Sequence, residues 1–75
     1  DAENIFYFAE FYALLDQHEL ALDWLEQAVD SGYFNYPGLV SNSAFDFAKN
    51  QPKYQAIIHK AKQRHDAFRE NVMPK

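Results

Sequence analysis

The chain has 75 residues and a net charge of −4, and 48% of its residues are hydrophobic and 17% aromatic. This length allows one domain at most, and the absence of cysteine excludes disulfides and thiolate metal sites. No apolar run reaches the roughly 18 residues of a membrane span and no signal peptide is visible, so we expect a cytoplasmic protein without membrane contact.

The charges are distributed unevenly along the chain. Residues 1–46 contain nine acidic and no basic residues, whereas residues 47–75 contain seven basic and two acidic ones. We expect the basic last helix to lie against the acidic helices and to balance their charge. The alternative is that the acidic helices present a surface to a basic partner.

A first helix is predicted for residues 3–15. Apolar residues recur there at the spacing of one helix face: Ile5, Phe8, Ala9, Tyr12 and Leu15. Further apolar residues occupy the opposite side: Phe6, Phe11, Ala13 and Leu14. A helix that is apolar nearly all round is buried on two sides. One side is expected to meet the next helix, and the other needs the C-terminal helix, a preceding repeat or a ligand.

The short break Asp16-Gln17-His18 predicts that the next helix, over residues 19–31, runs antiparallel to the first. Gly32 is well placed to end this second helix in a left-handed conformation. Its predicted apolar face is formed by Leu20, Ala21, Trp24, Leu25, Ala28 and Val29.

Two short helices are predicted between residues 33 and 51. Pro37 suits the first position of a helical turn that ends at Val40. Ser43 and Asp46 have the form of a capping box, which predicts a helix over residues 44–49. Pro52 then starts a last helix that runs to about residue 70, with Tyr54, Ile57, Ile58, Ala61, His65 and Phe68 on one face.

A motif of large and small residues covers the first two helices. Its members are Ile5, Phe8, Ala9 and Tyr12, followed by Ala21, Leu25 and Ala28. This pattern, over residues 2–32, resembles the tetratricopeptide repeat, a helix–turn–helix of about 34 residues. Three positions depart from the pattern: Ile5 replaces the usual Trp, Asp16 stands where a turn Gly is frequent, and Gly32-Tyr33 replaces the closing Pro. The remainder is similar to the tail that closes repeat arrays in many bacterial regulatory proteins.

The resemblance implies an all-α fold for a single domain, residues 1–75. A tetratricopeptide-like antiparallel hairpin (residues 1–32) would be followed by connecting short helices (33–51) and a long C-terminal capping helix (52–72), as at the end of an α–α superhelix. The expected core consists of Phe8, Ala9, Tyr12, Ala21, Trp24, Leu25, Ala28, Ile57, Ile58, Ala61 and Phe68.

In the repeat family, ligands lie along the concave surface formed by the first helices. The register of the resemblance places six residues near that surface: Glu3, Phe6, Tyr7, Glu10, Ala13 and Leu14. Phe6 and Tyr7 would then serve as buried anchors, and Glu10 would contact a basic side chain. The alternative is that Phe6 and Leu14 are covered by the last helix or by a preceding repeat.

No pattern in the sequence indicates catalysis, a metal site or a cofactor. The three histidines, His18, His59 and His65, do not form a ligand pair at helical spacing. The sequence has no Gly-rich phosphate loop. The basic residues of the last helix do not share one face and the pI is about 5.1, which argues against nucleic-acid binding.

The sequence therefore predicts a non-catalytic protein–protein interaction module, the C-terminal end of a repeat array in a bacterial regulatory or signalling protein. Its partner would be a protein or a peptide. Two alternatives remain: a purely structural cap, and an element that homodimerises through the uncovered side of the first helix.

Overall fold

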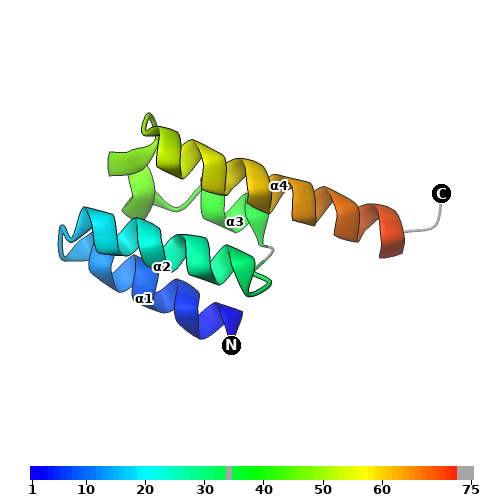
Figure 1. Cartoon of the computed structure of the whole chain (residues 1–75), viewed down its shortest axis with the longest axis horizontal. Coiled ribbons are helices and arrows are strands. Elements are labelled where there is room, and N and C mark those ends of the chain that lie inside the picture. Colours follow the sequence, from blue (N-terminus) through cyan, green and yellow to red (C-terminus); the bar gives the residue numbers. More distant parts are fainter. Residues whose placement is uncertain (34, 73–75) are drawn as a thin grey trace.

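The computed structural model in Figure 1 describes residues 1–33 and 35–72, with the side chains of residues 69–72 excepted. Its elements are α1 (Ala2–Leu14), α2 (His18–Asp30), α3 (Tyr36–Val40), the 3₁₀ helix η1 (Ser43–Ala48) and α4 (Pro52–Val72). The described part of the chain contains no strand, so the predicted all-α class is confirmed. Each predicted helix is present and begins within one residue of its predicted start.

Helices α1 and α2 form an antiparallel hairpin, and α4 lies along the side of α2 away from α1 (Figure 1). Small side chains make close packing of the hairpin possible, since Ala9, Ala21 and Ala28 have no exposed surface. A helix surface with only a methyl group lets the neighbouring backbone approach closely, and interdigitating larger side chains fill the remaining space. The alanines that the sequence motif singled out are thus part of the core.

The end of α2 has the geometry of a Schellman motif. The N–H of Tyr33 donates to the carbonyl of Ala28 (3.0 Å), and the N–H of Gly32 donates to the carbonyl of Val29 (3.1 Å). Gly32 has a φ of 110°, a conformation that costs little only for glycine. The predicted role of Gly32 in ending the helix is confirmed.

Helix α1 ends in the same motif with an aspartate in the glycine position. The N–H of Gln17 donates to the carbonyl of Tyr12 (2.9 Å), and that of Asp16 donates to the carbonyl of Ala13 (3.2 Å). Asp16 has a φ of 60°, in the left-handed region. Its negative charge also lies at the negative end of the helix dipole. This residue is therefore a point of local strain in the hairpin.

We predict that Asp16→Gly stabilises the chain by about 0.5 kcal/mol. Glycine removes the strain of the left-handed conformation, and this gain in free energy exceeds the cost of ordering a more flexible residue on folding. Asp16→Asn keeps the side-chain size and removes the charge, so it should give part of this gain. Chemical denaturation followed by circular dichroism measures both. A loss of stability in Asp16→Gly would show that Asp16 is not strained.

The core forms where α1, α2, α3, η1 and α4 meet, and its largest fully buried side chain is Phe45 of η1. Other buried members are Phe6, Ala9, Ala13, Ala21, Leu22, Leu25, Ala28, Val29, Leu39, Ala48, Tyr54, Ile57 and Ala61. Tyr12, Trp24 and Ile58 are partly buried against this cluster. The prediction was wrong for Phe8 and Phe68, which are 52% and 48% exposed.

The cap of η1 also differs from the prediction. Asn42 is the N-cap, and its Oδ1 accepts a hydrogen bond from the N–H of Ala44 at 3.0 Å. Ser43 is the first residue of the helix, so it does not begin a capping box with Asp46. Asp46 instead pairs with Lys49 at 2.9 Å. Asn and Ser are about equally good caps, which is why the sequence did not separate the two neighbours.

Ion pairs join α4 to α2, as the uneven charge distribution predicted. Lys53 contacts Asp23, and Lys60 Nζ lies 2.8 Å from Asp30 Oδ1. Both the acids and the bases are seven residues apart, so the two helices run parallel in a fixed register. Arg64 adds a hydrogen bond to the carbonyl of Val29 at the end of α2.

These pairs make stability depend on pH. The hydrogen bond from Lys60 lowers the pKa of Asp30, and the hydrogen bond to Asp23 raises the pKa of Lys53. The Asp30 contribution is present above the normal carboxyl pKa and is lost as the pH falls through the lowered value. The Lys53 contribution is present below the normal ammonium pKa and is lost as the pH rises through the raised value.

We predict that Asp23→Lys and Lys53→Asp each destabilise the chain by about 0.5 kcal/mol, as expected for an exposed pair. The double variant should recover most of the loss, because it restores an ion pair in the same register. Thermal or urea unfolding at low and high salt measures the effect, and salt should shrink it. Simple additivity of the two losses would contradict the pairing.

Candidate protein-binding surface

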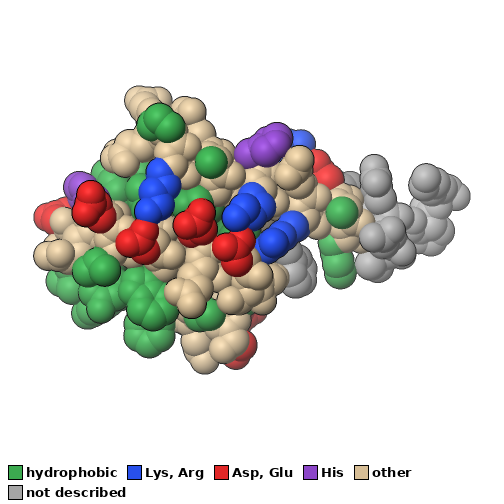
Figure 2. Space-filling model, viewed as in Figure 1, with side chains coloured by type: hydrophobic (Ala, Val, Ile, Leu, Met, Phe, Trp, Pro, Cys, Tyr) green, Lys and Arg blue, Asp and Glu red, His purple; other side chains and the backbone are tan. Residues whose placement is uncertain are grey.

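One side of α1 carries large apolar side chains that the described chain does not cover. Five of them are between 52% and 73% exposed: Tyr7, Phe8, Phe11, Leu14 and Leu15. We call these five residues the outer face. Figure 2 shows hydrophobic side chains gathered over α1 and the beginning of α2, the helix to which the exposed Leu20 belongs. Contiguous exposed apolar patches are typical of interaction surfaces, so the outer face is the candidate site.

The path of α4 explains why the outer face stays open. Helix α4 packs mainly on α2 and α3, whereas η1 and Tyr33 pack on the side of α1 away from the outer face. The side of α1 toward η1 is closed by Phe6, whose ring stacks on Tyr33 with centroids 4.3 Å apart. Phe45 closes the same side, with its ring 6.0 Å from that of Phe6. No described element reaches the opposite side of α1, which is the outer face.

Ring contacts shape the outer face into a shallow hollow. The ring of Phe8 packs against that of Trp24 of α2, with centroids 5.3 Å apart. The ring of Phe11 contacts that of Tyr12 edge-on, with centroids 5.7 Å apart. A cavity of about 550 Å³ lies among Asn4, Tyr7, Phe8, Phe11 and Tyr12. Rings held in this way by neighbours lose little conformational entropy when a partner covers them. The hollow therefore suits an apolar side chain of a partner.

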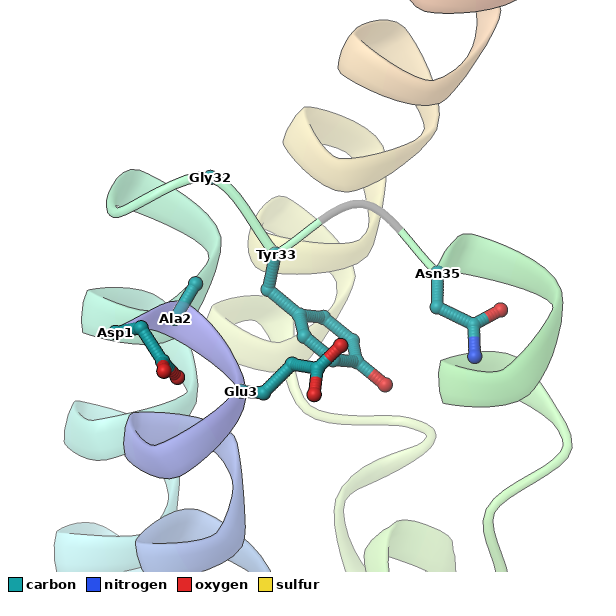
Figure 3. A pocket seen from close by; sticks show the side chains of 6 residues that line it. All are labelled: Asp1, Ala2, Glu3, Gly32, Tyr33 and Asn35. Atoms are coloured by element: carbon teal, nitrogen blue, oxygen red, sulfur yellow. The ribbon is translucent and has the colours of Figure 1, made fainter.

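A second, polar groove lies beside the outer face and shares Tyr7 with it. We call this the acidic groove; it has a volume of about 270 Å³ and is lined by Glu3, Phe6, Tyr7, Glu10, Tyr33 and Asn35. It adjoins a larger cavity of about 510 Å³ at the start of α1, where Asp1, Ala2 and Gly32 join Glu3, Tyr33 and Asn35 (Figure 3). Carboxylate, phenol and amide groups in these walls accept hydrogen bonds and attract cations.

The tyrosine in the acidic groove stays neutral at physiological pH. Burial raises the pKa of Tyr33, and the negative charge of Glu10 raises it further. A hydrogen bond with Asn35 opposes these effects, and Glu3 adds to them. Tyr33 therefore supplies a hydroxyl group and a ring wall, while Glu3 and Glu10 supply the charge.

Glu10 is engaged inside the protein. Its Oε2 accepts a hydrogen bond from Asn42 Nδ2 at 2.8 Å, and this bond joins α1 to the segment that starts η1. Asn42 thus uses its amide twice, because its oxygen caps η1. The predicted contact of Glu10 with a basic side chain of a partner would have to share the carboxylate with Asn42.

We predict that Asn42→Ala destabilises the chain by about 1–2 kcal/mol, because both the cap and the link to Glu10 are lost. Asn42→Ser is the matched control, since serine keeps the cap and loses the link, and it should cost about 1 kcal/mol. Urea denaturation measures both. Equal stability of Asn42→Ser and the unsubstituted chain would show that the Glu10 link contributes nothing.

The structure brings part of the predicted binding set to the surface and places the rest in the core. Glu3, Tyr7 and Leu14 are exposed, and Glu10 is partly buried. Phe6 and Ala13 are each only 6% exposed, so they belong to the core, and Phe6 also lines the acidic groove. The rings of Tyr33 and Phe45 cover Phe6. Leu14, which the alternative also expected to be covered, is 73% exposed.

Three residues of the outer face were not in the predicted set: Phe8, Phe11 and Leu15. The sequence motif assigned Phe8 to the core, and neither Phe11 nor Leu15 was among the residues expected near the concave surface. The signal that could have found them is the excess of apolar residues around α1, which showed that two sides of this helix need cover.

Comparison of the chain with family models, curated proteins and solved structures finds no match. Among the described residues, no group of three or more His, Asp or Glu side chains could hold a metal ion. None of the helices in the described part is long and apolar enough to cross a membrane.

Proposed function

We propose that this chain is a non-catalytic protein-binding module whose partner docks on the outer face of α1. The observation that carries the proposal is the exposure of five large apolar side chains on one helix face, beside a core that is otherwise well buried. Aromatic residues dominate the energetics of protein interfaces, and Tyr7, Phe8 and Phe11 form a contiguous group of them. The ring of Phe8 contacts Trp24 and the ring of Phe11 contacts Tyr12, and these contacts hold the group in place.

We further propose that the hairpin is of the tetratricopeptide type and forms the C-terminal end of a repeat array in a bacterial regulatory or signalling protein. The antiparallel arrangement of α1 and α2 and the full burial of Ala9, Ala21 and Ala28 support this proposal. The acidic groove would then lie on the ligand side of the array. The outer face would bind a helix of an adjoining protein element.

Replacement of Phe11 by Gln tests the docking role. A photo-crosslinking amino acid at position 11 first captures the partner in cells, and the same amino acid at Val40 of α3 is the control, because Val40 is exposed and lies off the outer face. Phe11→Gln should then lower the affinity for that partner by about tenfold or more, as expected for an aromatic anchor. Calorimetric titration measures the affinity.

The same substitution should leave the fold nearly unchanged, by about 0.5 kcal/mol or less, because Phe11 is exposed. Val40→Gln should change neither affinity nor stability. An unchanged affinity in Phe11→Gln, or equal crosslinking from positions 11 and 40, would contradict docking on the outer face and favour a purely structural cap.

A further inference from the structure

The charges around the outer face give information about its partner. Glu3 and Glu10 lie along one border of the face, and Asp16 lies at the end where α1 passes to α2. Residues 1–48 contain no Lys or Arg. Within the described residues, Glu3 and Glu10 form no ion pair, and Asp16 pairs only with His18, at 3.7 Å, so this border has no Lys or Arg partner.

The basic residues of α4 do not neutralise this border, because they are directed to the other side of the hairpin. Lys53 and Lys60 pair with Asp23 and Asp30 on α2, and Lys62 pairs with Asp66 within α4. Figure 2 shows Lys and Arg side chains beside acidic ones along the line between α2 and α4. Glu3 and Glu10 thus have no Lys or Arg counterpart in the described chain.

The outer face is also straight. Its members recur at spacings of three and four residues, so they form a ridge along the second half of α1 that ends at its C-cap, Leu15. The stretch from Tyr7 to Leu15 gives this ridge a length of about 13 Å. A ridge of this kind packs best against another helix, whose own side chains fill the hollows between Tyr7, Phe8 and Phe11.

From these observations we infer that the partner of the outer face is an amphipathic helix whose apolar stripe is bordered by Lys or Arg residues. The inference rests on the proposed function, since it names the partner of the same surface. A second copy of the chain fits less well, because two outer faces brought together would place their acidic borders side by side. The basic side chains Lys53 and Lys60 of such a copy are engaged with its own α2.

Three synthetic peptides of about 15 residues test the inference, a length at which helices become marginally stable in water. Each has the same leucine stripe, bordered by Lys, by Gln or by Glu. Trp24 is the single tryptophan of the chain and touches Phe8, so its fluorescence reports docking on the outer face. We expect the Lys peptide to bind about tenfold more tightly than the Glu peptide at low salt, with the difference reduced at high salt.

Two variants separate this inference from the proposed function. Phe11→Gln should weaken binding of all three peptides, whereas Glu3→Gln with Asp16→Asn should remove the preference for Lys and retain binding of the Gln peptide. Equal binding of the three peptides, still lost in Phe11→Gln, would overturn the charge preference and leave the docking face standing. Binding of the Lys peptide that Phe11→Gln does not weaken would overturn the inference, because the attraction would not involve the apolar face.

Failure of all three peptides to bind would overturn both proposals. Sedimentation of the free chain completes the test. A stable dimer that Phe11→Gln dissociates would show that a second copy occupies the face. The expected result is a monomer at the concentrations used for the titrations.

Discussion

The Phe6 ring lies between Tyr33 and Phe45, and this aromatic contact decides which side of α1 is covered. Stacked and tilted rings at 4.3 and 6.0 Å fix the rotation of α1 about its axis relative to η1. Once Phe6 faces η1, Phe11 necessarily points the other way, because the two residues are separated by 140° on a helix. The outer face is thus a consequence of how the core closes.

The uneven distribution of charge along the chain also helps to leave the outer face of α1 uncovered. Pairs at a spacing of seven residues hold α4 parallel to α2, so the longest helix of the chain covers α2 and α3. Each pair is exposed and contributes little alone, so the apolar side chains Tyr54, Ile57 and Ala61 supply most of the attachment. The pairs select the register, and this register leaves the acidic border of α1 without a Lys or Arg partner.

Much of the fold could be predicted from the sequence, because helical periodicity, Gly32, Pro37 and Pro52 are local signals. The site could be predicted only in part. Periodicity showed that α1 has two apolar sides, but the side that is covered depends on Phe45, which is distant in the sequence. The repeat motif therefore placed Phe8 in the core and Phe6 at the surface, and the structure has the reverse. Local sequence patterns do not show which of the two apolar sides of α1 packs against Phe45.

The central claim is that the outer face of α1 is open in the isolated chain and becomes covered in the complex. Hydroxyl-radical footprinting with mass spectrometry tests it directly, because side-chain oxidation follows exposure. We expect rapid oxidation of Tyr7, Phe8 and Phe11 and slow oxidation of Phe45 and Tyr54 in the free chain. Addition of the partner should protect the first group. Oxidation of Phe8 and Phe11 as slow as that of Phe45 in the free chain would contradict the account.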